Sequence, residues 1–94
     1  MVDNLKYYTY ILFSQKVGKY YVGQTENVVK RVQDHRAGLS KWTSNSDDWV
    51  LVYSIELNSR KEAIQQEKRI KKRGAGRWLI DENLNKFRDV AQSG

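Results

Sequence analysis

The chain has 94 residues, a length that fits one small domain with a single modest core. It contains no cysteine, which excludes a disulfide framework, a thiolate nucleophile and a cysteine-ligated zinc site. No apolar run approaches the roughly 20 residues of a membrane helix, and the first residues do not read as a signal peptide. We therefore expect a soluble, cytoplasmic protein with no membrane partner, in which residues 1–94 form one domain. Its core is expected over about residues 6–80, with a partly frayed extension over 81–94.

The positive charge is concentrated in one segment. The net charge is +6, and Arg60–Arg77 holds eight basic and two acidic residues, whereas bases and acids balance in the rest of the chain. A local basic cluster attracts polyanions and most often marks a nucleic-acid surface. The alternative is a solvated helix face that serves solubility.

The N-terminal part of the chain predicts a β-hairpin. Tyr7–Phe13 is rich in aromatic and β-branched residues, and a shorter second strand is expected over Tyr20–Gly23. A loop over Ser14–Val17 would pair Tyr10 with Tyr21 and place both rings on one face of the sheet.

A first helix is expected from the capping residue Asn27 to about Ala37, with Gly38 as its stop. The side chains that share one stripe of this helix are Val28, Arg31, Val32 and His35. A histidine on such a stripe is more often a hydrogen-bonded core residue than a catalytic one.

A third strand and two further helices complete the expected fold. Trp49–Ile55 is apolar enough to be central in the sheet or covered on both faces. Ser59 and Glu62 form a capping box for a helix that runs to about Arg73, and a short third helix begins over Arg77–Ile80. The order β-β-α-β-α-α predicts an α+β domain with a small three-stranded antiparallel sheet flanked by helices.

Glu67 is the most informative polar residue of the second helix. Its helical neighbours are Ala63, Ile64, Ile70 and Lys71. This position predicts a carboxylate along the apolar side, where an ionised group is costly unless it is paired or bound to a metal. Pairing with Arg31 or Lys71 is one explanation. The other is a single Mg²⁺ ion, which keeps most of its waters and needs few carboxylates.

These residue types have a shared chemical logic. Hydrolysis of a phosphodiester needs an activated water, a cation on the phosphate and a group that absorbs negative charge. Arg31 offers a planar fork that matches phosphate oxygens. Tyr10 or His35 could take the proton of the attacking water, and Tyr10 would need nearby cations because a phenol ordinarily has a pKa near 10.

Together these motifs resemble the GIY-YIG nuclease superfamily, from about residue 7 to residue 80. Tyr8-Thr9-Tyr10 stands where the family has GIY, and Tyr21-Val22-Gly23 stands where it has YIG, at the family's spacing. Gln66-Glu67-Lys68 matches an REK-like stretch. The chain is most similar to small bacterial stand-alone proteins that resemble the N-terminal endonuclease domain of UvrC.

The resemblance implies a role for each of five residues. Tyr10 would be the base that activates water, and Tyr21 would help to place water or phosphate. Arg31 would stabilise the charged transition state, and Glu67 would ligate one divalent ion, Mg²⁺ or Mn²⁺. His35 matches a position that some members use in catalysis and others lack.

The sequence departs from the family pattern at a few positions. Tyr8 replaces the glycine of GIY, and Gln24 follows YVG where UvrC-like proteins carry a lysine. Asn83 is a weak candidate for the asparagine that some members carry late in the domain. These departures bear on turnover more than on the fold.

DNA is the expected partner. Gly23 leaves space for a close approach at the end of a strand, and Trp42 would either stack on a base or belong to the core. The residues expected to contact nucleic acid are Gly23, Lys41, Thr43, Lys68, Lys71, Lys72 and Arg73.

The leading hypothesis is a metal-dependent endonuclease that hydrolyses phosphodiester bonds in DNA, in repair or recombination. The first alternative is a nucleic-acid-binding module with weak or no catalysis, which the basic segment and Gln24 favour. The second is a structural domain that binds a partner. Specificity would come from the surface of the core, from a partner protein or from a homo-oligomer.

Overall fold

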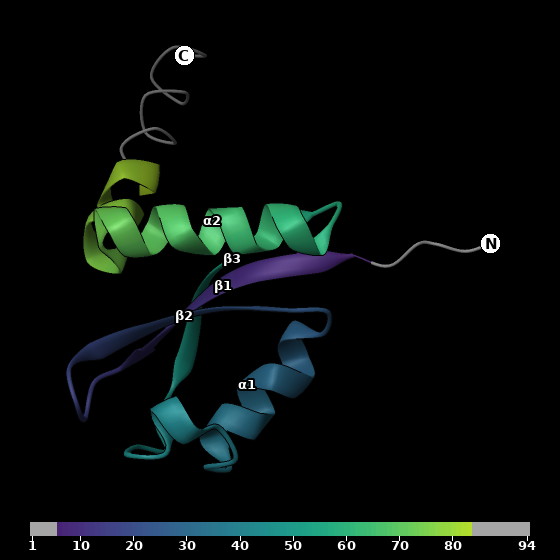
Figure 1. Ribbon diagram of the computed structural model, residues 1–94. Coiled ribbons are helices and arrows are strands. Elements are labelled where there is room, and N and C mark those ends of the chain that lie inside the picture. Colours follow the sequence, from purple (N-terminus) through teal and green to yellow (C-terminus); the bar gives the residue numbers. More distant parts are fainter. Residues whose placement is uncertain (1–5, 84–94) are drawn as a thin grey trace, which may run out of the picture.

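The computed structural model describes residues 6–83, which form a three-stranded antiparallel sheet with helices on both faces (Figure 1). The strands are β1 (Tyr7–Ser14), β2 (Lys19–Thr25) and β3 (Val50–Leu57), in the order β2-β1-β3. Helix α2 (Arg60–Arg73) covers one face, and α1 (Val28–Arg36) lies against the other. The expected α+β class and the expected order of elements are confirmed.

Both predicted helix caps are present. The Asn27 side chain accepts a hydrogen bond from the Lys30 amide at 3.1 Å, and the Ser59 hydroxyl accepts one from the Glu62 amide at 3.1 Å. Helix α2 ends at Gly74, whose φ of 96° is a conformation that residues with side chains rarely adopt. The chain is helical again over residues 75–83.

The hairpin register differs from the predicted one. The turn lies one residue later, because Gly18 occupies a position with a φ of 65° and Ser14 stays in the strand. Tyr10 is therefore opposite Gly23, and Leu12 is opposite Tyr21. The pairing is offset by two residues from the prediction, so Tyr10 and Tyr21 still share one face of the sheet.

The central strand is β1, not β3 as its apolar sequence suggested. Two buried clusters lie against β1, one with Tyr10 and Leu12 and the other with Ile11, which packs on Ile70 of α2. In contrast, β3 forms an edge of the sheet, and three consecutive apolar side chains at its start, Val50, Leu51 and Val52, are exposed. The prediction was wrong because apolar content does not fix the order of strands, whereas helices on both faces of β1 bury it.

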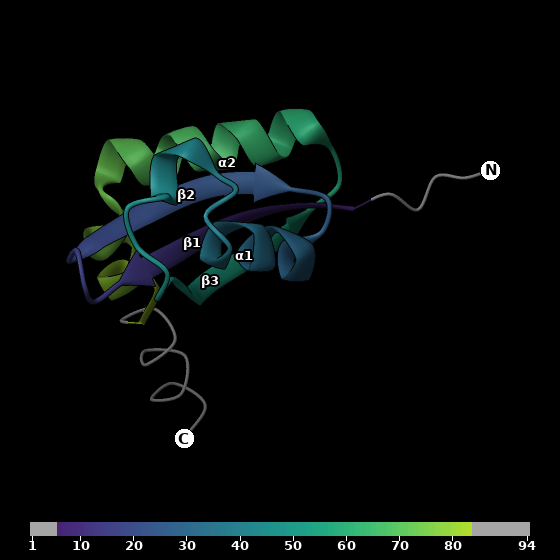
Figure 2. The same cartoon turned by 90° about the horizontal axis from the view of Figure 1, so that it is seen from below.

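Figure 2, turned by 90° from Figure 1, shows α1 in front of β1 and α2 behind the sheet. A short 3₁₀ helix, η1 (Lys41–Thr43), lies in the connection between α1 and β3. Within residues 6–83, no helix is long and apolar enough to cross a membrane. Most of the expected C-terminal extension, residues 84–94, lies outside the described part of the chain.

Candidate active site

A continuous line of hydrogen bonds runs through the buried layer between β1 and α1. The Tyr10 hydroxyl lies 2.9 Å from Nε2 of His35, and Nδ1 of His35 lies 2.6 Å from the Thr43 hydroxyl. Tyr10 comes from β1, His35 from the last turn of α1 and Thr43 from η1, and all three side chains are buried. The sheet, a helix and a loop thus converge on the imidazole.

Both central groups of this line are neutral near pH 7. Burial lowers the pKa of His35 to about 4, and the nearby Arg31 charge acts in the same direction. Burial also raises the pKa of Tyr10, with a further contribution from Tyr21, while Arg31 opposes the rise. A neutral imidazole has one donor and one acceptor nitrogen, so the hydrogen bonds run in a single direction. When Tyr10 donates to Nε2 of His35, Nδ1 carries the ring proton and donates to the Thr43 hydroxyl.

His35 should therefore make the stability of the protein depend on pH. Its pKa in the fold, about 4, lies below the ordinary 6.5, so the unfolded chain takes up the proton first as the pH falls. The stabilisation is complete above pH 6.5 and is lost progressively toward pH 4. Between about pH 7 and pH 4.5, wild type should lose about 2 kcal/mol of unfolding free energy more than His35→Asn. Chemical denaturation of both proteins tests this, and parallel pH profiles would refute it.

Gly23 makes the position of the Tyr10 phenol possible. A Cβ atom at Gly23 would lie 2.7 Å from the Tyr10 hydroxyl oxygen and 3.0 Å from Cε2 of Tyr21. Gly23 is buried, and the close approach that it allows is that of Tyr10. A contact with DNA at Gly23, which the sequence suggested, stays a prediction.

We expect Gly23→Ala to lower the unfolding free energy by about 1–3 kcal/mol, because the added methyl group overpacks a stiff aromatic pair. It should also displace the phenol from His35. The matched control is Gly76→Ala, where the new Cβ would meet only Tyr20 at 3.5 Å, an ordinary contact. Denaturation curves of the two variants give the comparison, and equal stabilities would contradict the assigned role of Gly23.

Tyr21 connects the buried line to an open groove. Its ring centroid lies 6.3 Å from that of Tyr10 and 4.8 Å from that of His35. The groove has a volume of about 610 Å³, and the residues that line it are Tyr20, Tyr21, Val22, Trp42, Glu67 and Lys71. Three consecutive residues of the edge strand β2 line this groove, so the groove extends across the free edge of the sheet from one face to the other. Glu67 lies on the face opposite α1, and it lines the same groove as Tyr21 because the groove crosses this edge.

Glu67 lies at the border of the buried stripe of α2, not within it. The buried residues of this helix are Ala63, Gln66 and Ile70, while the Glu67 side chain is 21% exposed. Its Oε2 atom accepts from Nζ of Lys71 at 2.6 Å, which is one of the pairings that the sequence left open. The expected burial among apolar neighbours is thus only partial.

The donor set at the groove fits a lightly ligated Mg²⁺ ion. Within residues 6–83, no three histidine or carboxylate side chains gather into a metal-binding group. Mg²⁺ commonly uses one or two carboxylates together with waters and substrate phosphates, so the partly exposed carboxylate of Glu67 suits it. A structural zinc or calcium site would need more protein ligands than this groove offers.

Arg31 lies beside the buried line and remains partly exposed. Its guanidinium is 3.8 Å from the Asp34 carboxylate, and its charge acts on the pKa of both Tyr10 and His35. An exposed guanidinium next to a buried phenol is suitably placed for a phosphate. The fold therefore brings together four of the predicted site residues from β1, β2 and α1, namely Tyr10, Tyr21, Arg31 and His35.

The predicted DNA contacts are dispersed. Lys41, Lys68, Lys71, Lys72 and Arg73 are exposed. Lys71 pairs with Glu67, and Arg73 pairs with Asp81 at 2.8 Å. Thr43 was expected to contact DNA, but it is fully buried and its hydroxyl contacts Nδ1 of His35 instead. Nothing in the sequence spacing pointed to this contact, because Thr43 reaches His35 only through the fold of the loop.

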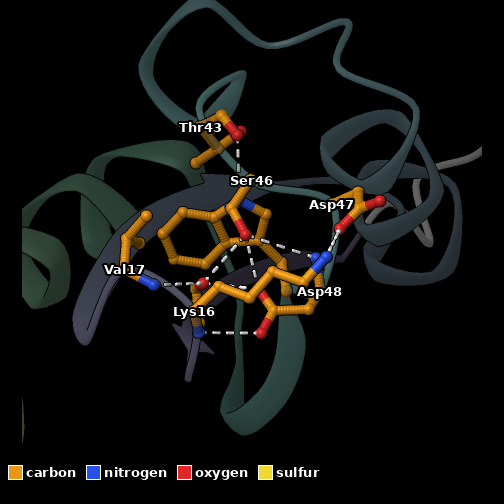
Figure 3. Close-up of polar contacts among 8 residues, drawn as sticks. Lys16, Val17, Thr43, Ser46, Asp47 and Asp48 are labelled. Atoms are coloured by element: carbon orange, nitrogen blue, oxygen red, sulfur yellow. Dashed lines mark hydrogen bonds and ion pairs between the residues drawn. The ribbon is translucent and has the colours of Figure 1, made fainter.

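A polar network fixes the loop that carries Thr43 (Figure 3). The Asp48 carboxylate accepts from the hydroxyls of Ser14 and Ser46 and from the Lys16 amide at 3.0 Å. These hydroxyls hold the pKa of Asp48 well below its usual range. The indole nitrogen of Trp49 donates to the Thr43 carbonyl at 2.9 Å. The loop is thereby tied to the end of β1 and to the core.

Comparisons with known proteins relate the whole domain to one family. The GIY-YIG catalytic domain family matches residues 6–77. The UPF0213 protein SH2523 of Staphylococcus haemolyticus (strain JCSC1435) is 39% identical over 67 residues, which make up 70% of this chain and 80% of that protein. The solution NMR structure of the UPF0213 protein BH0048 from Bacillus halodurans is similar with a TM-score of 0.51 and 28% identity, covering 84% of each chain. Because the family match spans the hairpin, α1 and α2 with the five site residues, this chain belongs to the GIY-YIG catalytic domain family, a family of the nuclease type.

Proposed function

We propose that the protein is a divalent-metal-dependent endonuclease that hydrolyses phosphodiester bonds in DNA. The observation that carries the proposal is the 2.9 Å hydrogen bond between Tyr10 and a neutral, buried His35, next to a groove that contains Glu67. A phenol in this setting can take a proton from water and pass its own proton on. In this proposal the protein acts in the cytoplasm, in DNA repair or recombination.

The first step of the mechanism is removal of a proton from the attacking water. The raised pKa of Tyr10 argues against a standing phenolate at neutral pH. Tyr10 instead accepts the water proton on its oxygen while it donates its hydroxyl proton to Nε2 of His35. Thr43 holds the imidazole through Nδ1, at 2.6 Å, and so keeps Nε2 aimed at the phenol.

The remaining residues act on the phosphate. Arg31 binds the non-bridging oxygens and offsets the negative charge that develops on them. Tyr21, at the mouth of the groove, orients the water or the phosphate. Glu67 would hold the Mg²⁺ or Mn²⁺ ion, which supplies charge neutralisation and Lewis-acid activation when it is bound.

DNA binding should rely on the basic residues at the end of α2. We expect charge reversal at Lys71, Lys72 and Arg73 to weaken binding of all DNA sequences, because phosphate contacts act through counterion release. The slope of log affinity against log salt should fall by about one for each cation that contacts a phosphate. Fluorescence anisotropy at several salt concentrations measures both. Lys61→Glu, an exposed position at the other end of α2, is the control. An unchanged slope in the triple variant would place this cluster away from DNA.

The proposed activity is tested by incubating the pure protein with duplex, nicked, overhanging and branched DNAs in Mg²⁺ or Mn²⁺. We expect cleavage that a chelator stops. One alternative is a DNA-binding module with little catalysis. The Glu67–Lys71 ion pair favours it, because the lysine already neutralises the carboxylate that would hold the metal. That alternative predicts steeply salt-dependent binding and no metal-dependent product from any of the DNAs.

A further inference from the structure

Trp42 is held in an exposed position by its neighbours. Its side chain is 73% exposed, whereas Ser40 and Thr43, on either side, are buried. Thr43 is fixed by His35 and by the Trp49 indole, so η1 has a defined position against the core. The exposure of Trp42 therefore belongs to an anchored segment, and the core role that the sequence left open is excluded.

Trp42 forms one wall of the groove that contains Glu67. Tyr20, which is 44% exposed, supplies a second aromatic surface of the same groove. Two cations accompany these rings: Nζ of Lys41 lies 5.6 Å from the Trp42 ring centroid, and Lys71 lines the groove itself. Aromatic faces beside cations match the two parts of a nucleotide, because the base is flat and apolar on its faces and the phosphate is an anion.

We infer that this groove takes an unpaired nucleotide of DNA, with its base stacked on the indole of Trp42 and its phosphate near Lys41 and Lys71. The volume of about 610 Å³ lies in the range of small-ligand sites and accommodates a single nucleotide. This inference rests on the proposed function and adds the class of substrate to it.

The base must be unpaired for a geometric reason. In a duplex, both faces of each base are covered by its neighbours in the stack, so a side chain reaches a face only at an end, a junction or a flipped nucleotide. The substrate is therefore DNA with a single-stranded segment next to the cleaved bond. Glu67, Tyr21 and Trp42 line one groove, which places the stacked nucleotide beside the proposed metal ligand.

The test measures binding without metal, so that it does not depend on cleavage. Wild type, Trp42→Ala, Trp42→Phe and the control Leu39→Ala, which removes another exposed apolar side chain (74% exposed) from the same connection, are titrated in chelator. The probes are labelled oligothymidylate, a duplex with an oligothymidylate overhang and a blunt duplex. Trp42→Ala should lose about 5- to 150-fold in affinity for the first two probes and change little on the blunt duplex. Trp42→Phe should retain most of the affinity, and Leu39→Ala should resemble wild type.

Indole fluorescence gives a direct second measurement. Stacking should quench the emission of wild type on binding oligothymidylate, and Trp42→Phe, which keeps Trp49 and Trp78, should lose this quenching. Equal affinities of wild type and Trp42→Ala for the overhang would overturn the inference and leave the groove to another occupant, such as a protein. Cleavage of DNA with no dependence on Trp42 would refute the stacking site alone. Stacking without cleavage would refute the proposed nuclease activity alone.

Discussion

Glu67→Gln is expected to lower metal-dependent cleavage by at least about a hundredfold, because a bound divalent ion contributes several kcal/mol to transition-state stabilisation. Glutamine keeps the size of the side chain but removes the charge that Mg²⁺ requires. DNA affinity in chelator should stay the same or rise, since a negative charge near the phosphates is gone. Nicking rate and anisotropy on the one variant measure both effects.

The structure makes this variant easier to interpret. Glu67 pairs with Lys71, an exposed residue four positions along the helix, and such pairs contribute only about 0.3–0.5 kcal/mol. The melting temperature should thus hardly change. Glu56→Gln is the matched control, because Glu56 is an exposed carboxylate 3.5 Å from Lys6 and lies outside the groove. Full nicking activity in Glu67→Gln would remove Glu67 from the reaction, and a large fall in melting temperature with normal cleavage would make it a structural residue.

Tyr10→Phe is expected to reduce cleavage by about 10²- to 10⁴-fold, the usual contribution of a positioned acid or base. The ring and its packing against Leu12 and Trp49 are retained, so the fold and DNA affinity should persist. The change also leaves Nε2 of His35 without its partner at 2.9 Å, which should lower the unfolding free energy by about 1–3 kcal/mol. Single-turnover cleavage and chemical denaturation give the two values.

Tyr53→Phe is the control for loss of a phenol hydroxyl. Tyr53 lies on the opposite side of the sheet, where its ring packs against Trp78. Loss of the Tyr53 hydroxyl should therefore leave cleavage unchanged. If Tyr10→Phe cleaved DNA at the wild-type rate, the proton would not pass through Tyr10. His35 would then have to act on water directly, and His35→Asn would be the decisive variant.

Local chemistry in the sequence was sufficient for the elements and their ends. Asn27 and Ser59 cap their helices because each side-chain oxygen satisfies an amide that has no partner in the first turn. Gly74 ends α2 because a positive φ excludes most other residues. These interactions join residues that are close in the sequence. The stripe of α1 that carries Arg31 and His35 was likewise predictable from helical spacing.

The order of the strands and the shape of the site required the tertiary structure. The alternation of side chains in a strand sets the face of the sheet on which Tyr10 and Tyr21 lie. The residue opposite each of them depends on the position of the hairpin turn, which Gly18 places one residue later than predicted. The apolar run of β3 gave no information about neighbours, since burial of a strand depends on what covers its two faces.

The amino-acid sequence by itself determined the family, the elements and the residue types that the chemistry needs, because these depend on short-range spacing. Only the tertiary structure decided that Thr43 contacts His35 and that Trp42 is exposed. It also decided that Glu67 and Tyr21 line the same groove at the β2 edge of the sheet. Each of these depends on contacts between residues far apart in the chain. The packing of a loop or a helix against the sheet fixes such contacts, and periodicity within one element does not contain them.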